Sequence, residues 1–154
     1  MGHLINASEV NEQALSYDVS SLWVAYWRSL IRGHDVPRAS DLSIIEQNPR
    51  LSPFAIWLAV YENDFHVRVV GEAIRDLYGG GQAQQKFSNL KLGPAHSFLQ
   101  KTLAKAVEER RIVCTVGHHA EDDMTRPTRL ERLVMPFCDE TAQITRLLVG
   151  YGLP

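Results

Sequence analysis

The stretch that most narrows the fold reads FAIWLAVYENDFHVRVVG and covers residues 54–71. Its first part, Phe54 to Tyr61, is aromatic, β-branched and otherwise apolar, a composition typical of a largely buried strand. Glu62 to Asp64 predicts a tight turn, and the alternation from Phe65 to Val70 predicts a second strand that ends before Gly71. The stretch therefore predicts a β-hairpin.

Helical segments follow this hairpin. Glu72 to Tyr78 predicts a short helix, and Pro94 stands near the first turn of a long helix that extends to Arg110. Three further strands are expected at Ile112–Val116, Leu130–Phe137 and Ile144–Tyr151. Two strands, a helical crossing and three strands joined by short turns predict an antiparallel α+β sheet, because a doubly wound nucleotide-binding fold needs alternating β-α-β units.

A broad apolar stripe precedes the hairpin and predicts an amphipathic flanking helix over residues 8–33, with Gly33 as its stop. A shorter helix is expected from Asp41 to Gln47, with Ser40 as its N-cap. The stripe is rich in aromatic residues, so it must be buried, either on the sheet of its own chain or on a second copy in a symmetric homodimer. The candidates for the dimer interface are Leu22, Trp23, Tyr26, Trp27 and Leu30. In the dimer case, alanine at Trp23 or Trp27 lowers the fraction of dimer.

Length and charge limit the classes of function. The 154 residues suit one domain, and 16 Lys+Arg against 18 Asp+Glu give a net charge of −2, which argues against nucleic-acid binding. No apolar run approaches the roughly 20 residues that span a bilayer, and residues 1–6 lack the features of a signal peptide. We therefore expect a cytoplasmic protein with no membrane partner. Cys114 and Cys138 are expected to be buried thiols.

An ordered set of short motifs carries a resemblance to a known family. The chain resembles the small bacterial stand-alone proteins of the PAS-domain family from about Trp23 to Gly150. The motifs are, in chain order, Tyr26-Trp27, Arg32-Gly33, Pro37, Asp41-Leu42, Phe65 to Gly71, Ile74, Leu77-Tyr78-Gly79, Arg129 to Phe137 with its Pro136, and Ile144 to Gly150.

The resemblance implies a specific fold and a general role. It implies a single PAS-like domain over residues 1–154, with a PAS core over residues 40–151: a five-stranded antiparallel sheet, helices on one face and an N-terminal flanking helix. It implies sensing, dimerisation or protein contact, with no reaction attached. The chain departs from the family at Gly79–Gly81, in the connection that lines the ligand side of PAS domains.

Motifs for catalysis and for cofactors are weak. The three glycines at 79–81 lack the Gly-Lys-Ser/Thr of a phosphate loop, and no nucleophile elbow is present, so we expect no enzyme. His118 and His119 are adjacent and would point to opposite sides of a strand, so no metal site is expected. His96 and His66 are poorly placed to bind haem, and neither cysteine stands in a flavin-type motif. The cofactor, if any, is unknown.

A ligand cavity between sheet and helices is the remaining site hypothesis. Arginines at alternating strand positions face water if their apolar neighbours face the core, and grip an anion if the parity is reversed. The leading hypothesis is a sensory domain that binds a small ligand or a protein partner and signals through a dimer. An adaptor without a ligand and, less favoured, a small α+β enzyme stay open. The pocket candidates are Trp57, His66, Arg68, Tyr78 and Arg132.

Overall fold

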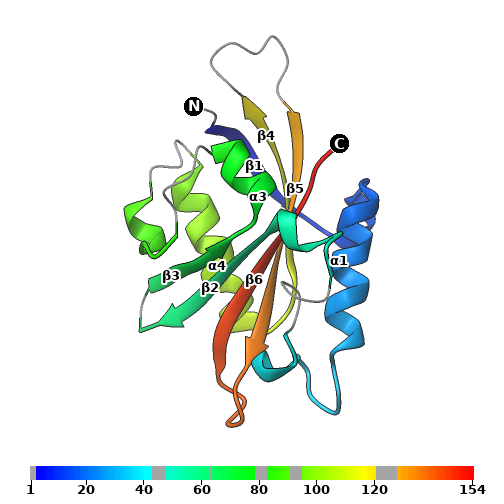
Figure 1. The fold of residues 1–154 in the computed structure, drawn as a ribbon, viewed down its shortest axis with the longest axis vertical. Helices are drawn as coiled ribbons and strands as arrows, with labels where there is room; N and C mark the ends of the chain where they lie inside the picture. The colour runs from blue at the N-terminus through cyan, green and yellow to red at the C-terminus, as the bar shows by residue number, and fades with distance from the viewer. Residues whose placement is uncertain (1–2, 43–47, 63, 79–82, 91–94, 121–127) are drawn as a thin grey trace.

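The computed structural model describes residues 3–42, 48–62, 64–78, 83–90, 95–120 and 128–154. Within them, six strands form one antiparallel sheet in the order β1-β4-β5-β6-β2-β3 (Figure 1). The strands are β1 (His3–Val10), β2 (Ala55–Tyr61), β3 (Asp64–Val70), β4 (Val113–Ala120), β5 (Thr128–Cys138) and β6 (Ile144–Gly152). The helices are α1 (Asp18–Ser29), α3 (Glu72–Tyr78) and α4 (His96–Glu109), with 3-10 turns at Glu12–Ala14, Ala39–Asp41, Ser52–Phe54 and Phe87–Asn89.

The α+β class, the hairpin and the crossing helix are confirmed. In the hairpin, Ile56 pairs with Val70 and Tyr61 pairs with Asp64. A bulge between Trp57 and Leu58 leaves Arg68 without a partner in the β2–β3 register. The expected short helix at Asp41–Gln47 falls largely on residues 43–47, which lie outside the described residues.

The prediction that a helix begins at Ser8 is wrong. Residues 3–10 form β1, which adds a sixth strand to the edge of β4, with Ala7 opposite Gly117. Helix α1 begins only at Asp18. The edge of β4 supplies backbone hydrogen-bond partners from more than a hundred residues away, and this long-range pairing overrides the local helical pattern.

Helices cover both faces of the sheet, and the register of the strands shows which residues face which helix. Gly150 of β6 lies under the Trp23 ring of α1, and Leu133 is opposite Gly150 on β5. The next residues along, Arg132 and Tyr151, are also opposite each other, and Arg132 reaches Thr102 of α4. We call these two sides the α1 face and the α4 face (Figure 1). The core is continuous through the sheet between them.

Among the described residues, no helix has both the length and the apolar character needed to cross a membrane.

Candidate functional site

A buried polar cluster lies at the centre of the α4 face. Arg132 is only 3% exposed, although it carries a fixed positive charge. Its Nη1 donates to Thr102 Oγ1 of α4 at 3.0 Å, and its Nε donates to the hydroxyl of Tyr151 on β6 at 3.3 Å. Thr115 of β4 is the register partner of Arg132 on the other side and is also buried. The two hydrogen-bond partners of the guanidinium are therefore both neutral hydroxyl groups.

A second buried charge lies directly behind it, on the α1 face. Glu131 is 0% exposed, and its carboxylate accepts hydrogen bonds from the backbone N–H of Ser16 at 2.6 Å and of Tyr17 at 3.0 Å. It also accepts from Ser20 Oγ at 2.6 Å and from Arg129 Nη2 at 2.9 Å. The N-cap residue of α1, Tyr17, makes no side-chain capping bond of its own. Glu131 thus fixes the entry of α1 to the sheet.

Strand β6 makes the same two-sided connection. The Trp23 indole of α1 donates from Nε1 to the backbone carbonyl of Tyr151 at 3.2 Å, while the Tyr151 hydroxyl accepts from Arg132 on the α4 face. A Cβ on Gly150 would lie 2.5 Å from the Trp23 ring, and a Cβ on Gly152 would lie 2.1 Å from Ser20 Oγ. The two glycines let α1 approach the backbone that carries Tyr151.

The five predicted pocket residues do not gather in one place. Arg132 is buried on the α4 face, but Trp57 and His66 belong to the α1 face. Trp57 is opposite Leu148, which lies two residues from Gly150 on β6 and so shares its face. His66 is opposite Ala59, which lies two residues from Trp57 on β2. Arg68 is exposed at the bulge. Tyr78 ends α3, and its side chain lies outside the described part. The reversed parity therefore holds for Arg132 and not for Arg68.

The predicted dimer residues divide between core and surface. Trp23 and Trp27 are buried on the sheet of their own chain, and the Trp27 indole donates to the Pro136 carbonyl at 2.9 Å. Leu22, Tyr26 and Leu30 are half-buried and recur every four residues along α1 and its C-cap, Leu30.

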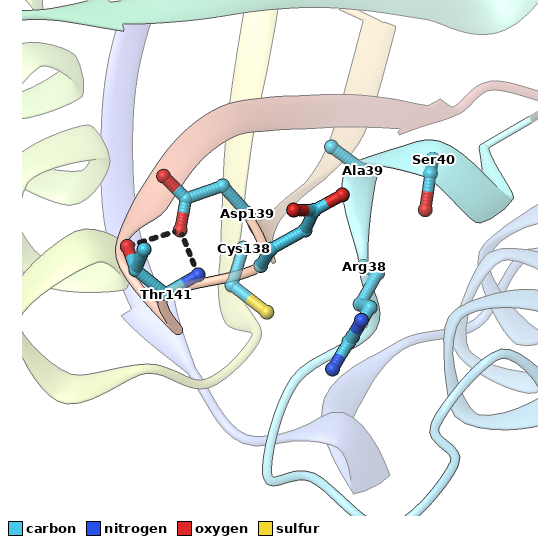
Figure 2. A pocket seen from close by; sticks show the side chains of 7 residues that line it. Arg38, Ala39, Ser40, Cys138, Asp139 and Thr141 are labelled. Carbon is cyan, nitrogen blue, oxygen red and sulfur yellow. Dashed lines mark hydrogen bonds between the residues drawn. The ribbon is translucent and has the colours of Figure 1, made fainter.

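A hollow of about 350 Å³ opens where residues 38–40 cross the β5–β6 turn. Figure 2 shows Arg38, Ala39 and Ser40 facing Cys138, Asp139 and Thr141 across it. One oxygen of Asp139 accepts from the backbone N–H and hydroxyl of Thr141 and from the N–H of Gln143. These bonds hold the pKa of the Asp139 carboxyl below its usual value. The Asp139 carboxylate is used to hold the β5–β6 turn, so its place beside the hollow is explained without a ligand.

A smaller hollow of about 240 Å³ lies between the end of β1, α1 and the start of β4, and Cys114 lines it. Burial raises the pKa of the Cys114 thiol to about 12. Because the thiolate is the reactive form, this cysteine is unsuited to act as a nucleophile.

We expect Cys114, in a Cys138→Ser background, to react with Ellman's reagent at neutral to mildly basic pH about 1000-fold more slowly than a thiol of ordinary pKa, because so little thiolate is present. The rate should rise to that of a free thiol in denaturant. A native rate close to that of free cysteine would contradict the burial of this thiol.

The sequence carries a signal for both buried charges, of which the predicted site residues include Arg132 and not Glu131. Both stand inside LERLVMPF, residues 130–137, an otherwise apolar strand. Adjacent residues of a strand point to opposite faces, so a strand that is apolar on both faces has to bury both charges. Thr102 becomes a partner of Arg132 only because α4 crosses β5.

The order of the strands agrees with a match to a known protein family. After β1, the chain forms two strands, then helices, then three strands, and β6 lies beside β2 in the sheet. A family model for the PAS domain matches residues 17–151. The chain belongs to the PAS-domain family. Strand β1 precedes the matched region and extends the PAS sheet at its β4 edge. Membership makes this a sensory or regulatory domain in general terms. A search of curated proteins finds no match to the chain.

Proposed function

We propose that this PAS domain is a non-catalytic sensor that binds a small ligand on the α4 face and signals through a homodimer formed by α1. The observation that carries the proposal is that adjacent residues of one strand contact opposite layers. Arg132 bonds to α4, while Glu131 holds the entry of α1. A ligand that shifts β5 therefore acts on both layers, provided that it has different affinities for the two arrangements.

The proposed dimer surface is the outer edge of α1. Leu22, Tyr26 and Leu30 form a half-buried apolar stripe beside the buried tryptophans. Since Trp23 and Trp27 are packed on their own sheet, alanine at either tests folding more than association. The stripe itself is the part of the predicted interface that a second copy can reach.

A non-catalytic role fits the chemistry of the buried acid. Glu131 already accepts hydrogen bonds from four donors, so its carboxylate has little capacity left to take a substrate proton. Its contacts are those of a structural anchor. The cytoplasmic location stays a prediction from the sequence.

The test of dimerisation is sedimentation of the wild type beside Leu22→Asp and Tyr26→Asp. We expect each charge to weaken self-association at least about 10-fold, because an unpaired charge is costly in an apolar interface. Ser21→Asp is the matched control, since Ser21 is exposed on the same helix. Identical sedimentation of all four proteins would count against α1 as the interface.

The test of ligand binding is a thermal-shift screen of metabolites, fatty acids, nucleotides and haem, because a ligand that binds the folded state raises the melting temperature. A second candidate function, an adaptor without a ligand, is favoured by one observation. Tyr61 is 56% exposed on the β2–β3 hairpin and lies against His66, with ring centroids 5.0 Å apart. Exposed Val69 is opposite Trp57 on the same face. No response across the whole screen would favour the adaptor.

A further inference from the structure

The structure treats two adjacent buried charges in opposite ways. Glu131 has an ion pair with Arg129 and three further donors, as buried charges require. Arg132 has two hydrogen bonds, both to neutral hydroxyl oxygens. In the part of the chain that the structure describes, no carboxylate lies within ion-pair distance of Arg132. The molecule therefore balances one buried charge and not the other.

The hydrogen-bond inventory of the guanidinium leads to the same point. An arginine side chain offers five N–H donors, of which two are used, and Nη2 makes no hydrogen bond with the described residues. Thr102 donates its own hydroxyl proton to the Leu99 carbonyl at 2.6 Å, so toward Arg132 it is an acceptor only. The nearest partners satisfy hydrogen bonds and leave the charge uncompensated.

A buried cation without a counter-charge costs several kcal/mol, because a guanidinium cannot lose its proton in proteins. A protein that needed only a filled core at this position would be better served by an apolar residue of similar volume. Retention of the charge is explained if a ligand supplies the missing anion.

We propose that Arg132 is the anion-binding residue of the α4 face and that the ligand is a small organic carboxylate with an apolar body. This inference rests on the proposed function and specifies its ligand class. A single guanidinium balances one negative charge, whereas a phosphate would bring up to two. The surroundings are apolar on both sides: Leu99 and Leu103 of α4 are buried above, and Leu130 and Val134 share the strand face. An apolar body suits these neighbours.

The experiment measures melting temperatures with sodium salts of straight-chain acids from acetate to octanoate, with the alcohols of the same chain lengths, and with inorganic phosphate. Wild type is compared with Arg132→Met, which keeps the volume and removes the charge, and with Arg68→Met, whose arginine is exposed. Arg132→Lys keeps the charge and loses the forked geometry, which guards against a folding defect in the methionine variant.

We expect carboxylates, and not alcohols or phosphate, to stabilise the wild type and Arg68→Met. The Kd should weaken at least about 20-fold in Arg132→Met and less in Arg132→Lys. Without carboxylate, Arg132→Met should be at least as stable as the wild type.

Three results would overturn the inference. If carboxylates raise the melting temperature equally in wild type and Arg132→Met, Arg132 is not the anion-binding residue, although a ligand site remains. If alcohols or phosphate stabilise the protein and carboxylates do not, the ligand is not a carboxylate, but the proposed ligand-binding function stands. A wild type that responds to none of these compounds, nor to the wider screen, removes both the inference and the proposed ligand-binding function.

Discussion

Glu131→Gln is expected to lower the free energy of unfolding by about 3 kcal/mol, because it removes the charge of a fully buried carboxylate that has four hydrogen-bond donors. The substitution leaves Arg129 Nη2, now 2.9 Å from the carboxylate, facing a neutral amide. It also replaces one acceptor oxygen with an N–H₂ group, so either the bond from Ser16 or the bonds from Tyr17 and Ser20 are lost.

The loss is expected to begin at α1. The N-terminus of a helix favours a negative charge, and α1 has no side-chain cap from Tyr17, so Glu131 provides both the acceptor and the charge from β5. Urea unfolding measures the change in free energy, and hydrogen exchange over residues 16–29 locates it. Glu140→Gln is the control, since Glu140 is exposed at the β5–β6 turn. A change below about 1 kcal/mol would show that water replaces the carboxylate without penalty.

Trp23→Ala is expected to lower the free energy of unfolding by about 4 kcal/mol, within the range for truncation of large buried aromatics. Trp23 is 0% exposed, its ring fills the space above Gly150, and its indole N–H is bonded to the Tyr151 carbonyl. The substitution removes the ring and leaves a cavity between α1 and β6.

Two comparisons make this prediction specific. Gly150→Ala places a Cβ 2.5 Å from the same ring and should also destabilise, by about 1–3 kcal/mol, through overpacking. Trp57→Ala, at a half-buried position, should cost less than Trp23→Ala. The Trp23→Ala variant should lose the same free energy of unfolding at all protein concentrations, because the ring is buried within one chain. A loss that appears only at concentrations where the wild type associates would place Trp23 in an interface between copies.

The elements with a strong local signal were predictable. The hairpin of residues 54–71 has alternation, aromatic content and a turn within a single short stretch, and α4 has a helical apolar stripe. Hydrophobic periodicity and turn residues act over a few neighbouring positions, so the sequence alone is enough to predict these elements. The family resemblance rested on the same segments, and the PAS match over residues 17–151 confirms it.

The candidate site was predictable only by residue type. That Arg132 stands in an apolar strand is visible in the sequence, but its parity depends on the pairing of β5 with β6 and on the helix that crosses it. A shift of one residue in that pairing would exchange Arg132 with Glu131 between the two faces. The prediction therefore left both parities open.

Local chemistry was enough to predict the strands after residue 54, the crossing helix and the apolar face of α1, because each depends on the spacing of apolar and polar side chains close together in the chain. Long-range pairing was needed for the rest. Residues 3–10 become a strand because the edge of β4 is free to bond to them, and Glu131 becomes the anchor of α1 because folding brings it next to residues 111 to 115 positions away. No spacing rule reaches that far, since contacts of this kind exist only once the sheet has closed between its two helical layers.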